Sequence, residues 1–240
     1  MCTVTYVRSI KCCFITSSRD ENNRRPNAFA PGIYEHNGVN ILYPKDSKAN
    51  GTWIACTQTG NAAVLLNGAF EKHIPQTTYR KSRGLIFLDI ISDSQPECHF
   101  LGMNLYNIEP FTLVLFTNGL LFEARWDGEQ KYFKQLDEKE NHIWSSATLY
   151  THEVIDKRKK WFEEWQVNTP EATAADIFNF HRFGGDGDIK NSILMNRHDE
   201  MLTVSITGIE LNTGFASMHH LDLKENKHYR QALSFETVAL

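Results

Sequence analysis

The chain opens with two runs of alternating β-branched or aromatic and polar residues. The runs cover residues 3–8 and 12–18, and the polar segment Arg8-Ser9-Ile10-Lys11 separates them. Alternation with a period of two, broken by a short polar segment, predicts a β-hairpin. We therefore expect the first two strands to be antiparallel, with their turn near Ser9 and Ile10.

The rest of the pattern predicts further strands with a few helices among them. Strands are expected at residues 52–57, 61–66, 98–105, 111–117, 119–126, 131–135, 201–209, 213–221 and 228–236, and helices at 78–92, 151–166 and 170–181. Asn118-Gly119 is a strong two-residue hairpin turn between two of the strands. Segregated strands and helices indicate an α+β fold, in which two antiparallel sheets lie between helical layers.

Composition limits the class of protein. The chain has 240 residues, of which 41% are hydrophobic, and it contains no Pro/Ser/Gly linker or internal repeat. These properties predict a single domain over residues 1–240. The net charge of −4 argues against a nucleic-acid partner, because no basic stripe is present to neutralise phosphates.

The sequence also predicts a cytoplasmic protein without a transmembrane segment. No run reaches the ~18–20 apolar residues that a membrane span requires, and polar residues interrupt the amino-terminal region where a signal peptide would need an apolar core. Five cysteines without regular spacing suit a reducing compartment better than a disulfide framework. The four cysteines after Cys2 lie in apolar runs and are expected in the core.

Cys2 is the first candidate for chemistry. If Met1 is removed, the α-amine of Cys2 lies beside its own thiol and can accept the thiol proton near neutral pH. The expected hairpin places Cys2 roughly opposite Ser17 to Ser18, so that Arg19 and Asp20 emerge at the same end of the sheet. Arg19 would lower the thiol pKa, and Asp20 would orient the amine. The alternative is an ordinary cysteine at a frayed terminus with a loop ion pair nearby.

Asn67 is the candidate donor for a developing oxyanion. It follows the apolar run Val64-Leu65-Leu66 at the end of an expected strand, from which an amide can point into a cleft. The alternative is that Asn67 and Gly68 form a simple turn. We expect no metal or other cofactor: adjacent His219 and His220 point to opposite faces of a strand, and no zinc or nucleotide motif occurs.

Several of these segments together resemble the NRDE family, also called the transport and Golgi organisation protein two family. The resemblance covers roughly residues 1–165 and rests on Met1-Cys2, Ser18-Arg19-Asp20-Glu21, Arg24-Arg25-Pro26, Gly51-Thr52-Trp53-Ile54-Ala55, residues 59–67, Ser82-Arg83-Gly84-Leu85 and Tyr106-Asn107. Two positions depart from the family pattern. Ser18 stands where the family has Asn, and Ser146 replaces the Asn of a later Ser-Asn element.

The family is in turn similar to N-terminal-nucleophile hydrolases of the choloylglycine hydrolase type. That resemblance implies a four-layer αββα sandwich, catalytic roles for Cys2, Arg19, Asp20 and Asn67, and a small-molecule amide substrate. Ser146 and Trp53 are expected to contact the substrate, with Ser146 a weaker donor than Asn. Many hydrolases of this fold assemble, so a homo-oligomer is also implied. A rival implied function is a non-catalytic carrier of haem or another hydrophobic small molecule in the same cleft.

Overall fold

The computed structural model describes residues 3–235, and within them the chain forms two stacked sheets. Sheet A has the order β10-β1-β2-β12-β13-β14, with β11 beside β12, and sheet B has the order β3-β4-β5-β6-β7-β8-β9. Sheet A contains β1 (Thr3–Arg8), β2 (Cys13–Asn22), β10 (His142–Ser145), β11 (Asn196–Arg197), β12 (Met201–Asn212), β13 (Phe215–Asp222) and β14 (Lys227–Ser234). Sheet B contains β3 (Phe29–His36), β4 (Val39–Lys45), β5 (Ile54–Thr57), β6 (Ala62–Asn67), β7 (Phe111–Thr117), β8 (Leu120–Trp126) and β9 (Lys131–Leu136).

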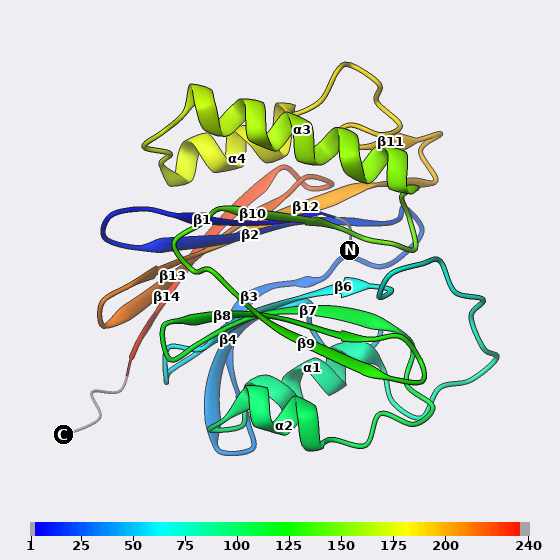
Figure 1. Cartoon of the computed structure of the whole chain (residues 1–240), viewed down its shortest axis with the longest axis vertical. Coiled ribbons are helices and arrows are strands. Elements are labelled where there is room, and N and C mark those ends of the chain that lie inside the picture. The colour runs from blue at the N-terminus through cyan, green and yellow to red at the C-terminus, as the bar shows by residue number, and fades with distance from the viewer. Residues whose placement is uncertain (1–2, 236–240) are drawn as a thin grey trace.

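A helix pair covers the outer face of each sheet. The pair on sheet A is α3 (His152–Asn168) and α4 (Ala174–Phe183), and the pair on sheet B is α1 (Arg83–Ile91) and α2 (Pro96–Gly102). Figure 1 shows the four layers stacked as helices, sheet A, sheet B and helices. The expected αββα sandwich of antiparallel sheets is therefore confirmed.

The side chains of β1 alternate between two apolar clusters, one on each face of sheet A. Val4 and Tyr6 belong to the large apolar cluster between the sheets, whereas Val7 belongs to the cluster beneath α3 and α4. Thr3 and Thr5 face the same helices through hydrogen bonds to Arg158 and His181. Because successive side chains of a strand point to opposite faces, β1 is buried on both sides.

The first hairpin is confirmed, but its register differs by one to two residues from the expected one. Thr3 pairs with Ser18 and Arg8 pairs with Cys13, so the turn lies at residues 9–12. On its other edge β1 pairs with β10, where Thr3 lies opposite Ser145. The Asn118-Gly119 turn is also confirmed, since both residues have the positive φ angles (52° and 76°) of a two-residue hairpin turn.

Three predictions for individual segments are wrong. Residues 98–105 form no strand: Pro96 occupies the first turn of α2, where proline is favoured, and Phe100 is the buried anchor of that helix. The helix expected from residue 170 begins at Ala174, because Thr173 and Asp176 form a capping box there. Cys98 is exposed on α2 and is not a core residue.

The membrane prediction was based on length and hydropathy. Among the helices that the structure describes, none is long and apolar enough to cross a bilayer.

Candidate active site

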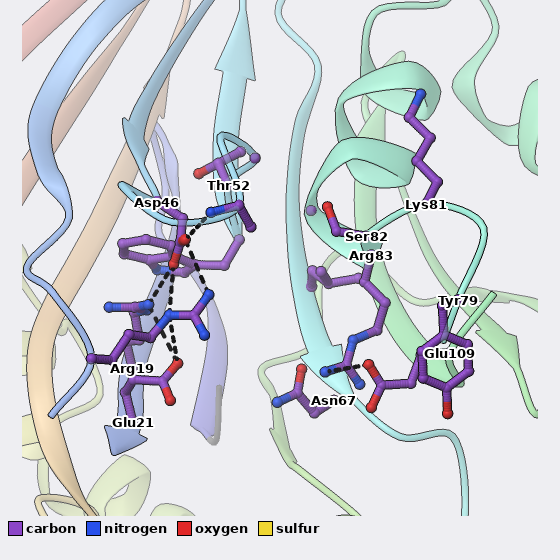
Figure 2. A pocket seen from close by; sticks show the side chains of 16 residues that line it. Arg19, Glu21, Asp46, Thr52, Asn67, Tyr79, Lys81, Ser82, Arg83 and Glu109 are labelled. Carbon is purple, nitrogen blue, oxygen red and sulfur yellow. Dashed lines mark hydrogen bonds and ion pairs between the residues drawn. The ribbon is translucent and has the colours of Figure 1, made fainter. Parts of the chain in front are cut away.

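A cavity of about 410 Å³ lies where residues of both sheets and of α1 come together. Figure 2 shows Arg19, Glu21 and Asp46 on one side of it, and Asn67, Arg83 and Glu109 on the other. Arg19 comes from β2 of sheet A and Asn67 from the end of β6 in sheet B. The cavity is therefore lined by two of the predicted catalytic residues, contributed by different sheets.

Asp46 binds two arginines, Arg19 and Arg25, on the charged side of the cavity. Its carboxylate accepts a hydrogen bond from the Arg19 guanidinium at 2.8 Å and two from Arg25 at 3.1 and 3.0 Å. The backbone N–H groups of Lys48 and Ala49 donate to the same carboxylate. Burial opposes the charge of Asp46, but the hydrogen bonds from Arg25 and Ala49 outweigh it and lower the pKa of Asp46.

Trp53 forms the floor beneath Arg19. The Arg19 guanidinium carbon lies 4.5 Å from the centroid of the indole ring, within the range of a cation–π contact. Trp53 is 3% exposed, lines the cavity, and its indole N–H has no acceptor within residues 3–235. The arginine is therefore held between an aromatic face and the Asp46 carboxylate.

Asn67 lines the cavity at the end of β6, and Ser146 contacts its backbone. The Asn67 side chain lines the cavity, while its backbone carbonyl accepts a hydrogen bond of 2.8 Å from the Ser146 hydroxyl. Ser146 is 1% exposed, also bonds Thr148, and is not among the lining residues. Its hydroxyl thus anchors the end of β6, and its role toward substrate stays a prediction.

Asp20 lies on the opposite face of β2 from Arg19. Its carboxylate accepts hydrogen bonds of 2.6 Å from Tyr150 and 2.5 Å from Thr203, on the side of sheet A that faces α3 and α4. Asp20 is 4% exposed and does not line the cavity. The side chains of Arg19 and Asp20 therefore do not converge on one point, although both lie near the end of the first hairpin.

Arg158 is a buried cation in this region that the sequence did not suggest. It is fully buried, forms no ion pair within the described residues, and donates hydrogen bonds to the Thr3 hydroxyl and the Asn191 and Ser192 carbonyls. Its guanidinium carbon lies 3.6 Å from the centroid of the Tyr150 ring. A chain of contacts thus joins Arg158 through Tyr150 to the Asp20 carboxylate.

The amino-terminal end of α1 forms the far wall of the cavity. Ser82, Arg83 and Gly84 all line it, and Arg83 pairs with Glu109 at 3.1 Å. Burial disfavours the charge of Arg83 and lowers its pKa, although Glu109 partly offsets this effect. Ser82 and Arg83 belong to one of the motifs that carried the family resemblance, but no functional role had been assigned to them.

The predicted residues thus fall into three groups. Arg19, Trp53 and Asn67 line the cavity, whereas Asp20 and Ser146 lie beside it on other faces. Cys2 lies outside the described residues, and the chain that follows it enters sheet A at Thr3. Across residues 3–235, no group of three or more His, Cys, Asp or Glu side chains is placed to hold a metal ion.

Solved structures with this fold include several hydrolases. Penicillin V acylase from Agrobacterium tumefaciens matches with a TM-score of 0.61 and 10% identity, covering 96% of this chain and 85% of that one. The C2A mutant of conjugated bile acid hydrolase from Clostridium perfringens matches with a TM-score of 0.56 and 9% identity, covering 99% and 100%. A Caenorhabditis elegans ortholog of N-acylethanolamine-hydrolyzing acid amidase gives 0.60 and 9%, covering 87% and 92%.

These likenesses confirm the fold of N-terminal-nucleophile hydrolases that the resemblance implied. In sequence, no curated protein matches the chain. The family model described as Transport and Golgi organisation 2 matches residues 1–203, which include every motif that carried the resemblance. The chain therefore belongs to the Transport and Golgi organisation 2 family.

Proposed function

We propose that the protein hydrolyses a linear, non-peptide amide bond through Cys2 after Met1 is removed. The observation that carries this proposal is that Arg19 and Asn67 meet at one cavity, at the end of sheet A where the chain enters β1. Val4 and Tyr6 face the interior between the sheets.

The chemistry requires few groups. The α-amine of Cys2 takes the thiol proton, and the thiolate attacks the amide carbon to form a tetrahedral oxyanion. The Asn67 amide donates to that oxygen. Collapse breaks the C–N bond, the protonated amine of Cys2 gives its proton to the leaving amine, and a thioester remains. Water then attacks the thioester, releasing a carboxylic acid and restoring the thiol.

Arg19 would act on the thiol of Cys2, and Asp20 would act on its α-amine. The Arg19 cation faces the cavity, where it favours a thiolate over a thiol. The buried Asp20 carboxylate lies on the other face of β2, held by Tyr150 and Thr203. A carboxylate in that position stabilises a protonated amine, which is the form of the base after it has accepted the thiol proton.

The conjugated bile acid hydrolase supports the same choice of nucleophile. That protein was solved as its C2A mutant, so its second residue is also a cysteine. The neighbours in structure are an acylase, a bile acid hydrolase and the ortholog of an amidase, and this supports an amide as the class of substrate.

The lining of the cavity does not favour the alternative, a carrier of haem or another hydrophobic ligand. Ligand sites for such molecules are mostly apolar, whereas seven of the lining residues carry charge: Arg19, Glu21, Arg25, Asp46, Lys81, Arg83 and Glu109. Among the described lining residues, Tyr79 is the only side chain of a type that ligates haem iron. A polar amide substrate suits this lining better.

The test combines intact mass, thiol labelling and turnover. Native protein is expected to lack Met1 and to hydrolyse members of an N-acyl amide panel, and Cys2→Ser is expected to abolish both turnover and labelling by a thiol-directed acylating probe. Cys98→Ser is the matched control, because Cys98 is exposed on α2 and far from the chemistry proposed. Quantitative retention of Met1 on soluble native protein, or full turnover by Cys2→Ser, would refute the proposal.

Asn67→Ala tests the oxyanion donor separately. Loss of one such donor lowers kcat by roughly 10²–10³-fold in other hydrolases. The fold should survive, because the Asn67 side chain makes no hydrogen bond within residues 3–235, and Ser146 bonds only the backbone carbonyl. A variant with unchanged kcat would remove Asn67 from the mechanism.

A further inference from the structure

The carboxylate of Asp20 accepts a hydrogen bond from a hydroxyl group on each of its two oxygen atoms. Tyr150 donates to Oδ2 at 2.6 Å, and Thr203 donates to Oδ1 at 2.5 Å. Hydrogen bonds from a hydroxyl to an ionised oxygen are about 2.5–2.7 Å long, and both distances fall in that range. The three side chains are each at most 5% exposed. Solvent therefore does not compete for these bonds.

The local structure of β12 directs Thr203 toward Asp20. The Thr203 hydroxyl oxygen accepts a hydrogen bond of 2.9 Å from the backbone N–H of Met195, so its own proton is available for the carboxylate. The register of β12 against β2 shifts between Thr203, which pairs with Asp20, and Ser205, which pairs with Arg19. A β-bulge of this kind re-aims side chains and is common beside active sites. Thr203 and Ser205 can thereby match Asp20 and Arg19, which face opposite sides of the sheet.

Two arginines contact the ring of Tyr150. The guanidinium carbon of Arg158 lies 3.6 Å from the ring centroid, and that of Arg197 lies 5.2 Å from it. Both are within the ~6 Å range of cation–π contacts. Positive charge beside a phenol stabilises the partial negative charge that its oxygen acquires when the hydroxyl donates. The two arginines therefore make Tyr150 a stronger donor to Asp20.

His181 lies on the same face of the first hairpin but contributes no charge. Its ring nitrogens bond the hydroxyls of Thr5 and Ser18 at 2.9 and 2.7 Å. Burial, and then the charge of Arg158, lower the pKa of His181 to about 3, so the imidazole is neutral near pH 7. Within residues 3–235, the charges in contact with the Tyr150 ring are thus the positive ones of Arg158 and Arg197.

A carboxylate that orients an α-amine has two opposing effects on it. It fixes the direction of the amine, but its negative charge also favours the protonated amine, which cannot accept a thiol proton. Hydrogen bonds donated to the carboxylate, and positive charges near it, offset that negative charge. The hydroxyls and arginines behind Asp20 therefore suit a carboxylate that orients the base and still leaves it basic.

We propose that Tyr150 and Thr203 are positioning residues that limit the negative charge Asp20 presents to the α-amine of Cys2, so that this amine is a free base near neutral pH. The inference rests on the proposed function, because it takes Cys2 as the amino terminus and Asp20 as the partner of its amine. Both residues act through Asp20, and neither is assigned a contact with the substrate.

The test measures the reactivity of the Cys2 thiol against pH and needs no substrate. Protein that begins at Cys2, released where necessary from a cleavable amino-terminal fusion, reacts with iodoacetamide at a series of pH values from about 5 to 9, a range that spans the ordinary pKa values of a thiol and an α-amine. The mass of the amino-terminal peptide gives the rate at each pH.

Loss of either hydroxyl should move this profile to higher pH. In Tyr150→Phe and in Thr203→Val, Asp20 loses one donor, and its more negative carboxylate favours the protonated form of the amine and thiol together. The midpoint is expected to rise by about 0.5–1 pH unit in each variant. Thr203→Ser keeps the hydroxyl and is expected to retain the wild-type midpoint.

Tyr6→Phe is the matched control. Tyr6 is also a buried tyrosine with one hydroxyl bond, 2.8 Å to the Glu138 carbonyl, but it belongs to the apolar cluster between the sheets. Its loss should lower stability without moving the midpoint, because a looser fold changes access to the thiol and hence the maximum rate. Cys98, exposed on α2, serves as an internal reference in every sample.

The possible results separate this inference from the proposed function. Wild-type midpoints in both Tyr150→Phe and Thr203→Val, or an equal shift in Tyr6→Phe, would overturn the positioning role, whereas turnover of an N-acyl amide by the same wild-type protein would retain the hydrolase. Shifted midpoints in Tyr150→Phe and Thr203→Val alone would support the positioning role. The same shifts in a protein that hydrolyses no N-acyl amide would retain that role and reject the hydrolase.

Discussion

Asp46→Asn tests the charged wall of the cavity most directly. Asparagine keeps the shape of the side chain and one oxygen for the backbone N–H groups, but it removes the charge that faces Arg19 and Arg25. The Arg19 side chain is 6% exposed and that of Asp46 is 11% exposed, so water cannot replace the lost partner. Neutralising one member of a buried pair costs about 3–5 kcal/mol.

Two features reduce that figure here. The Arg25 side chain is 29% exposed, and Glu21 remains within 3.4 Å of both guanidinium groups. We therefore expect Asp46→Asn to lower the free energy of unfolding by about 2–3 kcal/mol at pH 7. Urea titration followed by circular dichroism measures this loss. Glu21→Gln is the matched control, with an expected loss below about 1 kcal/mol because Glu21 is more exposed.

The loss of unfolding free energy in Asp46→Asn should become smaller at low pH. The pKa of Asp46 is lowered in the folded state from about 3.8, so its charge stabilises the fold fully above that value. The stabilisation disappears as the pH falls through the folded pKa. The difference between wild type and Asp46→Asn should therefore shrink below pH 3.8. A loss under about 1 kcal/mol at pH 7, or a difference that stays constant down to pH 2, would refute this account of the cavity wall.

Substitutions at two other residues, His181 and Gly84, test separate features of the fold. Burial, and then the Arg158 charge, lower the pKa of His181 to about 3, so the unfolded chain alone takes up this proton between pH 6.5 and 3. His181→Gln should remove a stability loss of about 1.4 kcal/mol per pH unit over that range, and parallel urea midpoints from pH 7 to 4 would contradict this. Gly84→Ala should cost about 1–3 kcal/mol because its Cβ meets the Thr52 carbonyl at 2.8 Å. Gly102→Ala has open space and should cost little; equal losses in thermal unfolding would reject the tight contact.

Local patterns predicted much of the fold where the chain alternates cleanly. The first hairpin and the hairpin of β7 and β8 have a period of two, so both could be inferred. Only the second has an unambiguous two-residue turn, and only its register was predicted correctly. The strands β3 and β4 were not predicted, because Pro31 and Gly32 interrupt β3, and that strand is only partly buried. The segment of α2 was assigned to the wrong class because its short apolar run fits a strand as well as a helix.

Some of the residues that line the cavity were singled out from the sequence, but their arrangement was not. Asn67 was singled out because it stands at the end of β6. Arg19 was singled out because it follows the apolar run 12–18, although β2 continues to Asn22. Arg19 and Asp20 were expected to act at one point, but neighbours in a strand face opposite sides. The contacts of Asp20 with Tyr150 and Thr203 could not be inferred, because both partners are distant in sequence. Asp46 and Arg83 required knowledge of which loops converge, since they reach the cavity from segments distant in sequence.

Some of the segments that contact β1 are synthesised long after it, so this strand gains its contacts in stages during translation. One edge of β1 pairs with β10, and the Thr3 hydroxyl binds Arg158, which follows it by 155 residues. At a synthesis rate of 5–20 residues per second, Arg158 is made roughly 8–30 s after Thr3. During that interval the strand has its β2 neighbour but neither β10 nor the buried arginine. The aminopeptidase step that the proposed function requires thus has a period during translation before β10 and Arg158 contact the first strand.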